Sequence, residues 1–114
     1  MSTIYHITSV EGWAAAQAAG HYAAASLTRE GFMHCSTPAQ IVATCNRHYP
    51  GKRGLLLLAI DPARVEAEIR MENTSGGSEI FPHIYGVLNL NAVTARLPFE
   101  PDADGTFRSL PAEE

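Results

Sequence analysis

The second half of the chain carries hydrophobic patterns that are typical of β-strands. Residues 55–60 form a continuous apolar run, which predicts a central strand buried on both faces. In residues 65–72, and again in residues 93–97, apolar side chains occupy alternate positions. Each of these segments is therefore expected to be a half-buried strand. Residues 80–85 are expected to form a further, less regular strand.

The first half of the chain combines short strand patterns with helical ones. Residues 3–7 are rich in β-branched and aromatic side chains, and residues 31–35 form a similar short apolar segment, so both are predicted to be strands. A helix is predicted over residues 9–19, with Thr8 as its N-cap and Gly20 as its C-terminal stop.

The order of the predicted elements favours an α+β fold. A second helix is expected after Thr37 and before Pro50, so both helices lie near the N-terminus and most strands follow them. This order argues against a doubly wound parallel sheet, in which strands and helices alternate. Residues 1–100 are predicted to be a single domain, and residues 101–114 an acidic, proline-containing tail that is loose or draped over it.

Composition narrows the classes of protein that remain. The 114 residues suffice for one domain, and 46% hydrophobic with 18% charged residues is globular composition. A net charge of −4 argues against a broad basic surface for duplex nucleic acid. The chain has no apolar run long enough to cross a membrane and no secretory signal. Its two cysteines, Cys35 and Cys45, are expected to be free thiols in a reducing cytoplasm.

Histidine placement is the most specific chemical signal. Three of the five histidines, His6, His34 and His83, lie inside predicted strands with apolar neighbours on both sides. Burying an imidazole without a hydrogen-bond partner costs about 1–3 kcal/mol. We therefore expect the three to share a polar pocket, or each to be a satisfied core histidine. His21 and His48 lack this setting and are interpreted as incidental.

A metal site built from the three strand histidines is a further hypothesis. Zinc can take three histidines and a water molecule. The chain lacks the usual local signatures, which are two histidines four residues apart on a helix or an HxH pair on a strand. No metal ligands are therefore assigned.

The segments that contain these histidines resemble a known family. The matching stretches are Tyr5-His6-Ile7-Thr8, the segment from Glu30 to Ser36, and Phe81-Pro82-His83-Ile84-Tyr85-Gly86. They resemble the bacterial domain of unknown function 952, which is grouped by fold with the ADP-ribosyltransferase-like proteins. The resemblance implies a split, mainly antiparallel sheet with an NAD-shaped cleft. It implies NAD as a possible substrate and no required cofactor.

The same resemblance implies roles for individual residues. His6 would contact the ribose next to nicotinamide, and His34 would contribute to the nicotinamide pocket. The third motif position stays open among Glu72, Glu79 and His83. The candidate catalytic residues are therefore His6, His34, His83, Glu72 and Glu79, and the candidate ligand contacts are Tyr5, Phe32, Ser36, Tyr85 and Arg29.

Three functions remain open at this point. The first is an enzyme that processes NAD, ADP-ribose or another nucleotide by ADP-ribosyl or phosphoryl transfer. The second is a non-catalytic module that binds a small, nucleotide-like ligand. The third is a metal-dependent hydrolase that uses the three histidines. The sequence leaves the oligomeric state undetermined.

Overall fold

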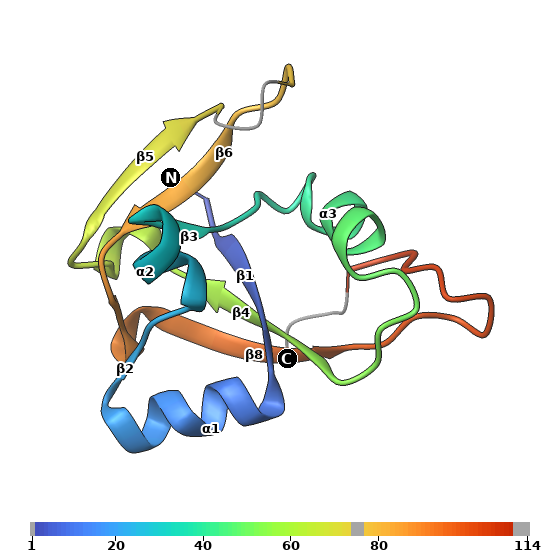
Figure 1. The fold of residues 1–114 in the computed structure, drawn as a ribbon, viewed down its shortest axis with the longest axis horizontal. Helices are drawn as coiled ribbons and strands as arrows, with labels where there is room; N and C mark the ends of the chain where they lie inside the picture. Colours follow the sequence, from blue (N-terminus) through green and yellow to red (C-terminus); the bar gives the residue numbers. More distant parts are fainter. Residues whose placement is uncertain (1, 74–76, 111–114) are drawn as a thin grey trace.

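The computed structural model describes residues 2–73 and 77–110, and it is an α+β fold of small antiparallel sheets and helices (Figure 1). The strands are β1 (Ile4–Ser9), β2 (His21–Tyr22), β3 (Met33–His34), β4 (Leu55–Ile60), β5 (Glu68–Glu72), β6 (Phe81–Tyr85), β7 (Leu88–Asn89) and β8 (Val93–Phe99). The helices are α1 (Val10–Ala19), α2 (Ala25–Glu30) and α3 (Ile41–His48), with 3-10 turns η1 (Pro62–Arg64) and η2 (Leu90–Ala92). No helix in this described part is long and apolar enough to span a membrane.

Strand β4 is the centre of the main sheet, as its apolar run predicts. It pairs antiparallel with β1 on one side and β8 on the other, and all six of its residues are buried. Leu56, Leu58 and Ile60 belong to one core cluster, and the alternate residues of the strand belong to a second. The prediction of a strand buried on both faces is therefore confirmed.

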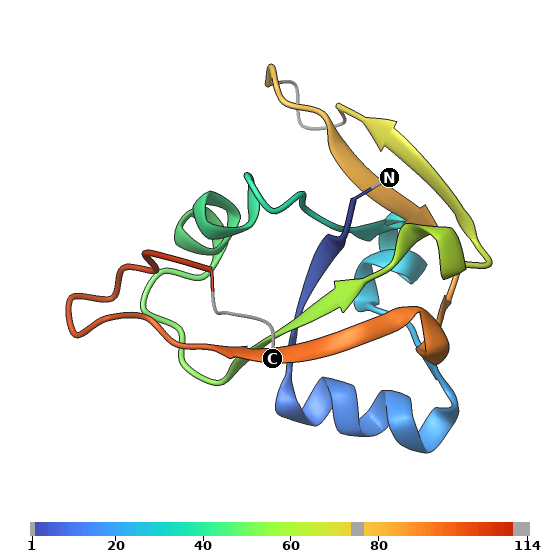
Figure 2. The ribbon, with the colours of Figure 1, turned by 180° about the vertical axis from the view of Figure 1, so that it is seen from behind.

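Helices α1 and α3 cover opposite faces of this sheet, as Figure 2 shows from behind. Ala16 of α1 packs in the first cluster, whereas Ile41 and Cys45 of α3 pack in the second. Because Ile41 and Cys45 are four residues apart, they lie on the same face of α3, and this face packs on the core.

A second three-stranded sheet, with the order β3-β6-β5, meets the main sheet at a single bridge. Tyr5 of β1 and Ser36 exchange both backbone hydrogen bonds, each 2.8 Å long between nitrogen and oxygen. The remaining pair, β2 and β7, forms a separate two-stranded sheet. The two larger sheets therefore share only a short stretch of backbone.

The start of α1 differs from its prediction by one residue. Ser9, rather than Thr8, is the N-cap, and its hydroxyl accepts a hydrogen bond from the Gly12 N–H. Thr8 stays extended because β1 continues its pairing with β4 through Ser9. Gly20 ends the helix in the left-handed conformation with φ 86°, as predicted.

The prediction of two helices is wrong, because the structure has a third short helix, α2. The six residues Ala25–Glu30 have no side-chain cap at Ala24 and include only Ala25 and Leu27 as apolar positions. So short a segment presents no helical periodicity to detect. Gly31 ends this helix in the left-handed conformation with φ 88°, and β3 begins two residues later.

The segment predicted to be a loose or draped tail packs on the domain as far as residue 110. Phe107 is only 1% exposed and lies in the second core cluster beside Phe99. The side-chain amide of Asn46 in α3 donates to the Phe107 carbonyl and accepts from its N–H, both at 2.8 Å. The globular unit therefore extends beyond the predicted boundary at residue 100, while residues 111–114 lie outside the described part.

We expect Phe107→Ala to lower the free energy of unfolding by about 3–5 kcal/mol, because it removes a fully buried aromatic ring and leaves a cavity. Urea unfolding followed by circular dichroism measures the change. Ser109→Ala, at an exposed neighbouring position, is the control and should change stability by less than about 0.5 kcal/mol. Equal stability of both variants would show that residues 101–110 do not belong to the folded unit.

Candidate functional site

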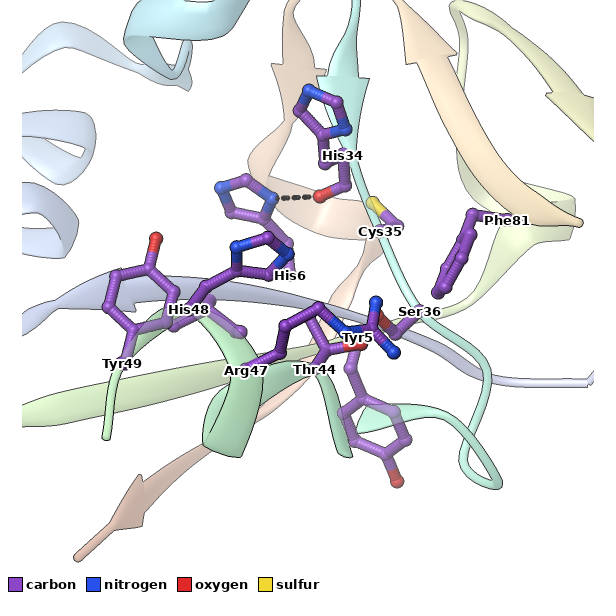
Figure 3. Close-up of a pocket in the computed structure, with 11 residues that line it drawn as sticks. Tyr5, His6, His34, Cys35, Ser36, Thr44, Arg47, His48, Tyr49 and Phe81 are labelled. Atoms are coloured by element: carbon purple, nitrogen blue, oxygen red, sulfur yellow. Dashed lines mark hydrogen bonds between the residues drawn. The ribbon is translucent and has the colours of Figure 1, made fainter. Parts of the chain in front are cut away.

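The pairing between β1 and the chain that follows β3 is limited to the Tyr5–Ser36 bridge. In an antiparallel ladder the next hydrogen-bonded pair would be Ile7 and His34, two residues further along each chain. Instead, the His34 carbonyl accepts a hydrogen bond of 2.6 Å from Nδ1 of the His6 ring (Figure 3). The imidazole takes the place of the next backbone donor, and the two strands separate at this point.

The His6 ring is fully engaged by the protein. Its Nδ1 carries a proton because the His34 carbonyl can only accept, and its Nε2, which lies 2.9 Å from the Tyr22 hydroxyl, accepts from that hydroxyl when the ring is neutral. Burial lowers the pKa of His6 from 6.5 to about 4, against the opposing effect of the His34 hydrogen bond. Burial also raises the pKa of Tyr22, which keeps its hydroxyl a donor. The visible role of His6 is to fix where the sheets part.

A pocket of about 200 Å³ opens beside this separation. Figure 3 shows the side chains that surround it. They come from β1, from the chain that runs from β3 to Ser36, from α3 and its C-terminal end, and from the start of β6. The lining residues are Tyr5, His6, Ile7, His34, Cys35, Ser36, Thr44, Arg47, His48, Tyr49 and Phe81.

The donor and acceptor roles of two hydroxyl groups in the lining can be assigned. Thr44 donates to the Gln40 carbonyl at 3.0 Å, and the Ser36 and Thr44 hydroxyl oxygens are 3.1 Å apart. Because Thr44 has only one hydroxyl proton, Ser36 is the donor of this second bond. The Ser36 oxygen is then left with acceptor capacity toward a ligand.

A second group of polar and aromatic side chains shares one face of the β3-β6-β5 sheet. Strand register pairs His34 with His83, and His83 with Arg70. Side chains alternate along each strand, so every second residue lies on this same face. We call this set the histidine face; its members are Phe32, His34, Ser36, Phe81, His83, Tyr85, Glu68, Arg70 and Glu72.

Within the histidine face, Glu72 joins His83 to Tyr85. One carboxylate oxygen of Glu72 lies 2.9 Å from Nδ1 of His83 and accepts a hydrogen bond of 2.6 Å from the Tyr85 hydroxyl. The Tyr85 bond, followed by the His83 bond, lowers the pKa of Glu72. Phe32 stacks on the buried His83 ring at 4.3 Å between centroids. This network leaves His83 little access to a ligand.

His34 belongs to both the pocket and the histidine face. Its ring lies 5.2 Å from the His83 ring between centroids, and its Nε2 lies 3.0 Å from a carboxylate oxygen of Glu30. The hydrogen bond from His34 lowers the pKa of Glu30. The His34 side chain is 52% exposed. Of the three strand histidines, His34 is thus the one with a ring open to a ligand.

The predicted site residues therefore fall into separate groups. Tyr5, His6, His34 and Ser36 line the pocket, whereas Phe32, His83, Glu72 and Tyr85 form the adjoining network. Two further candidates belong to neither group: Glu79 lies next to the pocket, with a carboxylate oxygen 3.7 Å from the Arg47 guanidinium, and Arg29 lies in the last turn of α2.

Seven pocket residues were not predicted as site residues. They are Ile7, Cys35 and Phe81, together with four on α3 and at its C-terminal end, Thr44, Arg47, His48 and Tyr49. Arg47 and His48 follow Thr44 by three and four residues, which is the spacing of one helix face. This spacing could have indicated that the three side chains share a face of the helix. It was missed because these residues adjoin the apolar residues that pack on the core, and because His48 was interpreted as incidental.

The proposed three-histidine metal site is not formed. Both ring nitrogens of His6 are bonded within the protein, so this residue has no lone pair to offer a metal ion. Over residues 2–73 and 77–110, no three histidine, cysteine or acidic side chains are placed to hold one. Cys35 and Cys45 are free, and burial raises the pKa of Cys35 to about 12.

Comparison with known proteins establishes the family. The model of the family described as "Protein of unknown function (DUF952)" matches residues 7–96. Because this match covers most of the chain, the protein belongs to the domain of unknown function 952 family, as its motifs indicate. His34 and His83 lie within the matched range, and His6 immediately precedes it.

Solved structures of one relative share the fold. The X-ray crystal structure of protein CC0527 from Caulobacter crescentus has a TM-score of 0.83 at 32% sequence identity, covering 94% of each chain. Its solution NMR structure has a TM-score of 0.81 at 33% identity, covering 95% of this chain and 93% of that one. No curated protein matches this chain. The comparisons thus define a family and a fold without assigning a function.

We expect the stability of the protein to fall as the pH drops from about 6.5 toward 4. In this window the unfolded chain binds a proton at residue 6 that the folded protein excludes, because the pKa of His6 is lowered to about 4. The loss should approach about 1.4 kcal/mol per pH unit. Urea unfolding at pH 7.0 and pH 5.0 measures it.

His6→Asn is the test variant, because its amide N–H lies near the position of Nδ1 but does not titrate. The variant should lose less stability between pH 7.0 and 5.0 than the wild type, and the exposed control His21→Asn should behave like the wild type. If the stability of His6→Asn depends on pH as strongly as that of the wild type, the lowered pKa of His6 is contradicted. Nitrogen NMR shifts should independently show a neutral ring protonated on Nδ1.

Proposed function

We propose that the protein binds a small nucleotide-like molecule of the NAD or ADP-ribose class in the pocket beside the separation of β1 and β3. The observation that carries this proposal is that the His6 ring replaces a backbone donor and leaves a lined pocket where the sheets part. Antiparallel sheets that separate around a cleft are also what the resemblance to ADP-ribosyltransferase-like proteins implies.

The lining suits an amphipathic ring or sugar. Tyr49 and Phe81 offer aromatic surface, while His34 and Ser36 offer polar atoms. Ligand sites commonly combine an apolar wall with a few polar groups in this way.

Pocket size limits how the ligand sits. Drug-sized ligands usually occupy pockets of about 300–1,000 Å³. A volume of about 200 Å³ accommodates one ring or sugar and not a whole dinucleotide. We infer that one end of the ligand enters the pocket and that the rest lies across its rim.

Binding without turnover is the function that we favour. Catalysis on a nucleotide needs a free acid or base at the reacting bond. His6 has both ring nitrogens bonded, and the bonded oxygen of Glu72 is shared between His83 and Tyr85. These groups hold the site in shape more than they offer chemistry to a ligand.

An NAD-cleaving enzyme remains the second candidate because of His34. This residue lines the pocket, and its exposed ring is oriented by Glu30, an arrangement typical of a general acid or base. In such an enzyme, water would replace nicotinamide at the ribose and yield ADP-ribose.

Binding is tested by calorimetry with NAD, ADP-ribose and nicotinamide, together with NMR shift mapping. We expect at least one of these ligands to bind, with shifts at the pocket residues. His34→Ala should weaken binding about tenfold, because it removes a polar contact, and His21→Ala should have no effect. No heat and no shifts with any of the three at millimolar concentration would overturn the proposal.

Turnover is tested by chromatographic detection of nicotinamide after incubation with NAD. We expect no release above the uncatalysed rate. Release that His34→Ala abolishes while the protein still binds NAD would establish the enzyme instead and would assign His34 as its catalytic residue.

A further inference from the structure

We propose that Arg47 binds a phosphate group of the ligand and that Glu79 occupies this position when the pocket is empty. This inference rests on the proposed function and adds the residue that binds the phosphate of that ligand. It assigns Glu79, a candidate catalytic carboxylate by sequence, a different role as an internal competitor.

The Arg47 guanidinium has unused binding capacity. It lines the pocket from the last turn of α3, its side chain is 52% exposed, and its nearest carboxylate oxygen, on Glu79, is 3.7 Å away. This distance exceeds that of a hydrogen bond. A guanidinium has five N–H donors in a fork that suits phosphate oxygens.

Two other arginines of the chain form direct hydrogen bonds with carboxylates and serve for comparison. Arg70 makes two hydrogen bonds to Glu68, at 2.9 and 3.0 Å. Arg108 makes bonds of 2.8 and 2.6 Å to two aspartates. The contact between Arg47 and Glu79 is therefore a loose charge pair that a better anion can displace.

Glu79 is held at the rim by its neighbours. The side-chain amide of Gln40 donates to the Ile80 carbonyl at 2.8 Å, which ties this segment to the start of α3. Phe81, two residues after Glu79, already lines the pocket. We therefore infer that the Glu79 carboxylate lies where the phosphate of a bound ligand would extend out of the pocket.

The polarity of the pocket agrees with a sugar phosphate. Ser36 donates its proton to Thr44 and so presents an acceptor, which matches the donor of a sugar hydroxyl. Arg47 supplies a guanidinium to the lining, and His48, which is the last residue of α3 and is drawn with it in Figure 3, adds an imidazole. A sugar hydroxyl inside the pocket would donate to Ser36, and a phosphate at the rim would accept from Arg47.

The test compares a nucleotide with the nucleoside that lacks its phosphate, using nicotinamide mononucleotide against nicotinamide riboside and AMP against adenosine. Calorimetry gives the ratio of the two dissociation constants. In the wild type the nucleotide should bind about tenfold more tightly. Arg47→Gln should bring the ratio close to one while the nucleoside affinity stays unchanged.

Glu79→Gln should raise the ratio by up to about fivefold, because the competing carboxylate is gone. Two exposed controls match the charge changes outside the pocket: Arg53→Gln for Arg47, and Glu66→Gln for Glu79. Each control should leave the ratio at its wild-type value. If a control variant changes the ratio as much as the pocket variant that it matches, the change comes from net charge alone, and the inference is overturned.

The remaining outcomes separate this inference from the proposed function. Equal binding of nucleoside and nucleotide would overturn the phosphate site and leave the pocket proposal standing. If neither binds, an NMR titration with inorganic phosphate decides. Phosphate-dependent shifts of the Arg47 side chain would support the anion site and reject the nucleotide class, and no shifts would reject both.

Discussion

The hydrogen bond from the His6 ring to the His34 carbonyl is the interaction on which the site depends. An antiparallel ladder continues as long as each strand supplies a backbone partner at alternate residues. Here a side chain satisfies the His34 carbonyl, so the ladder ends after one bridge without leaving that acceptor unpaired. Burial keeps the imidazole neutral, so that Nδ1 donates to this carbonyl while Nε2 stays an acceptor for the Tyr22 hydroxyl.

This constraint also explains the division of the polar residues into two groups. Where the strands part, α3 reaches the gap from the main-sheet side and lines it together with β1. On the β3-β6-β5 sheet, Glu72 fixes His83 and Tyr85 in an aromatic network under Phe32. His34 stands between the two groups, so it is the residue through which the network could influence a ligand.

Sequence reasoning succeeded where local pattern and tertiary role coincide. The apolar run of β4 is buried on both faces because one strand lies between two core clusters, and the family motifs identify the relationship that the comparisons confirm. It failed for α2, which is too short to show a period. It also failed for Phe107, whose burial depends on a pair of hydrogen bonds to Asn46, 61 residues away in the chain.

The sequence by itself determined the α+β class, the central strand and the recurrence of histidines in apolar strand settings. Those properties follow from side-chain chemistry and short-range periodicity. Only the tertiary structure decided the surroundings of three side chains. The His6 ring donates a hydrogen bond to a backbone carbonyl, His83 is buried under Phe32, and Arg47 lines a pocket. The physical reason is that a side chain's availability depends on its partners in space, and these come from distant segments that no local pattern encodes.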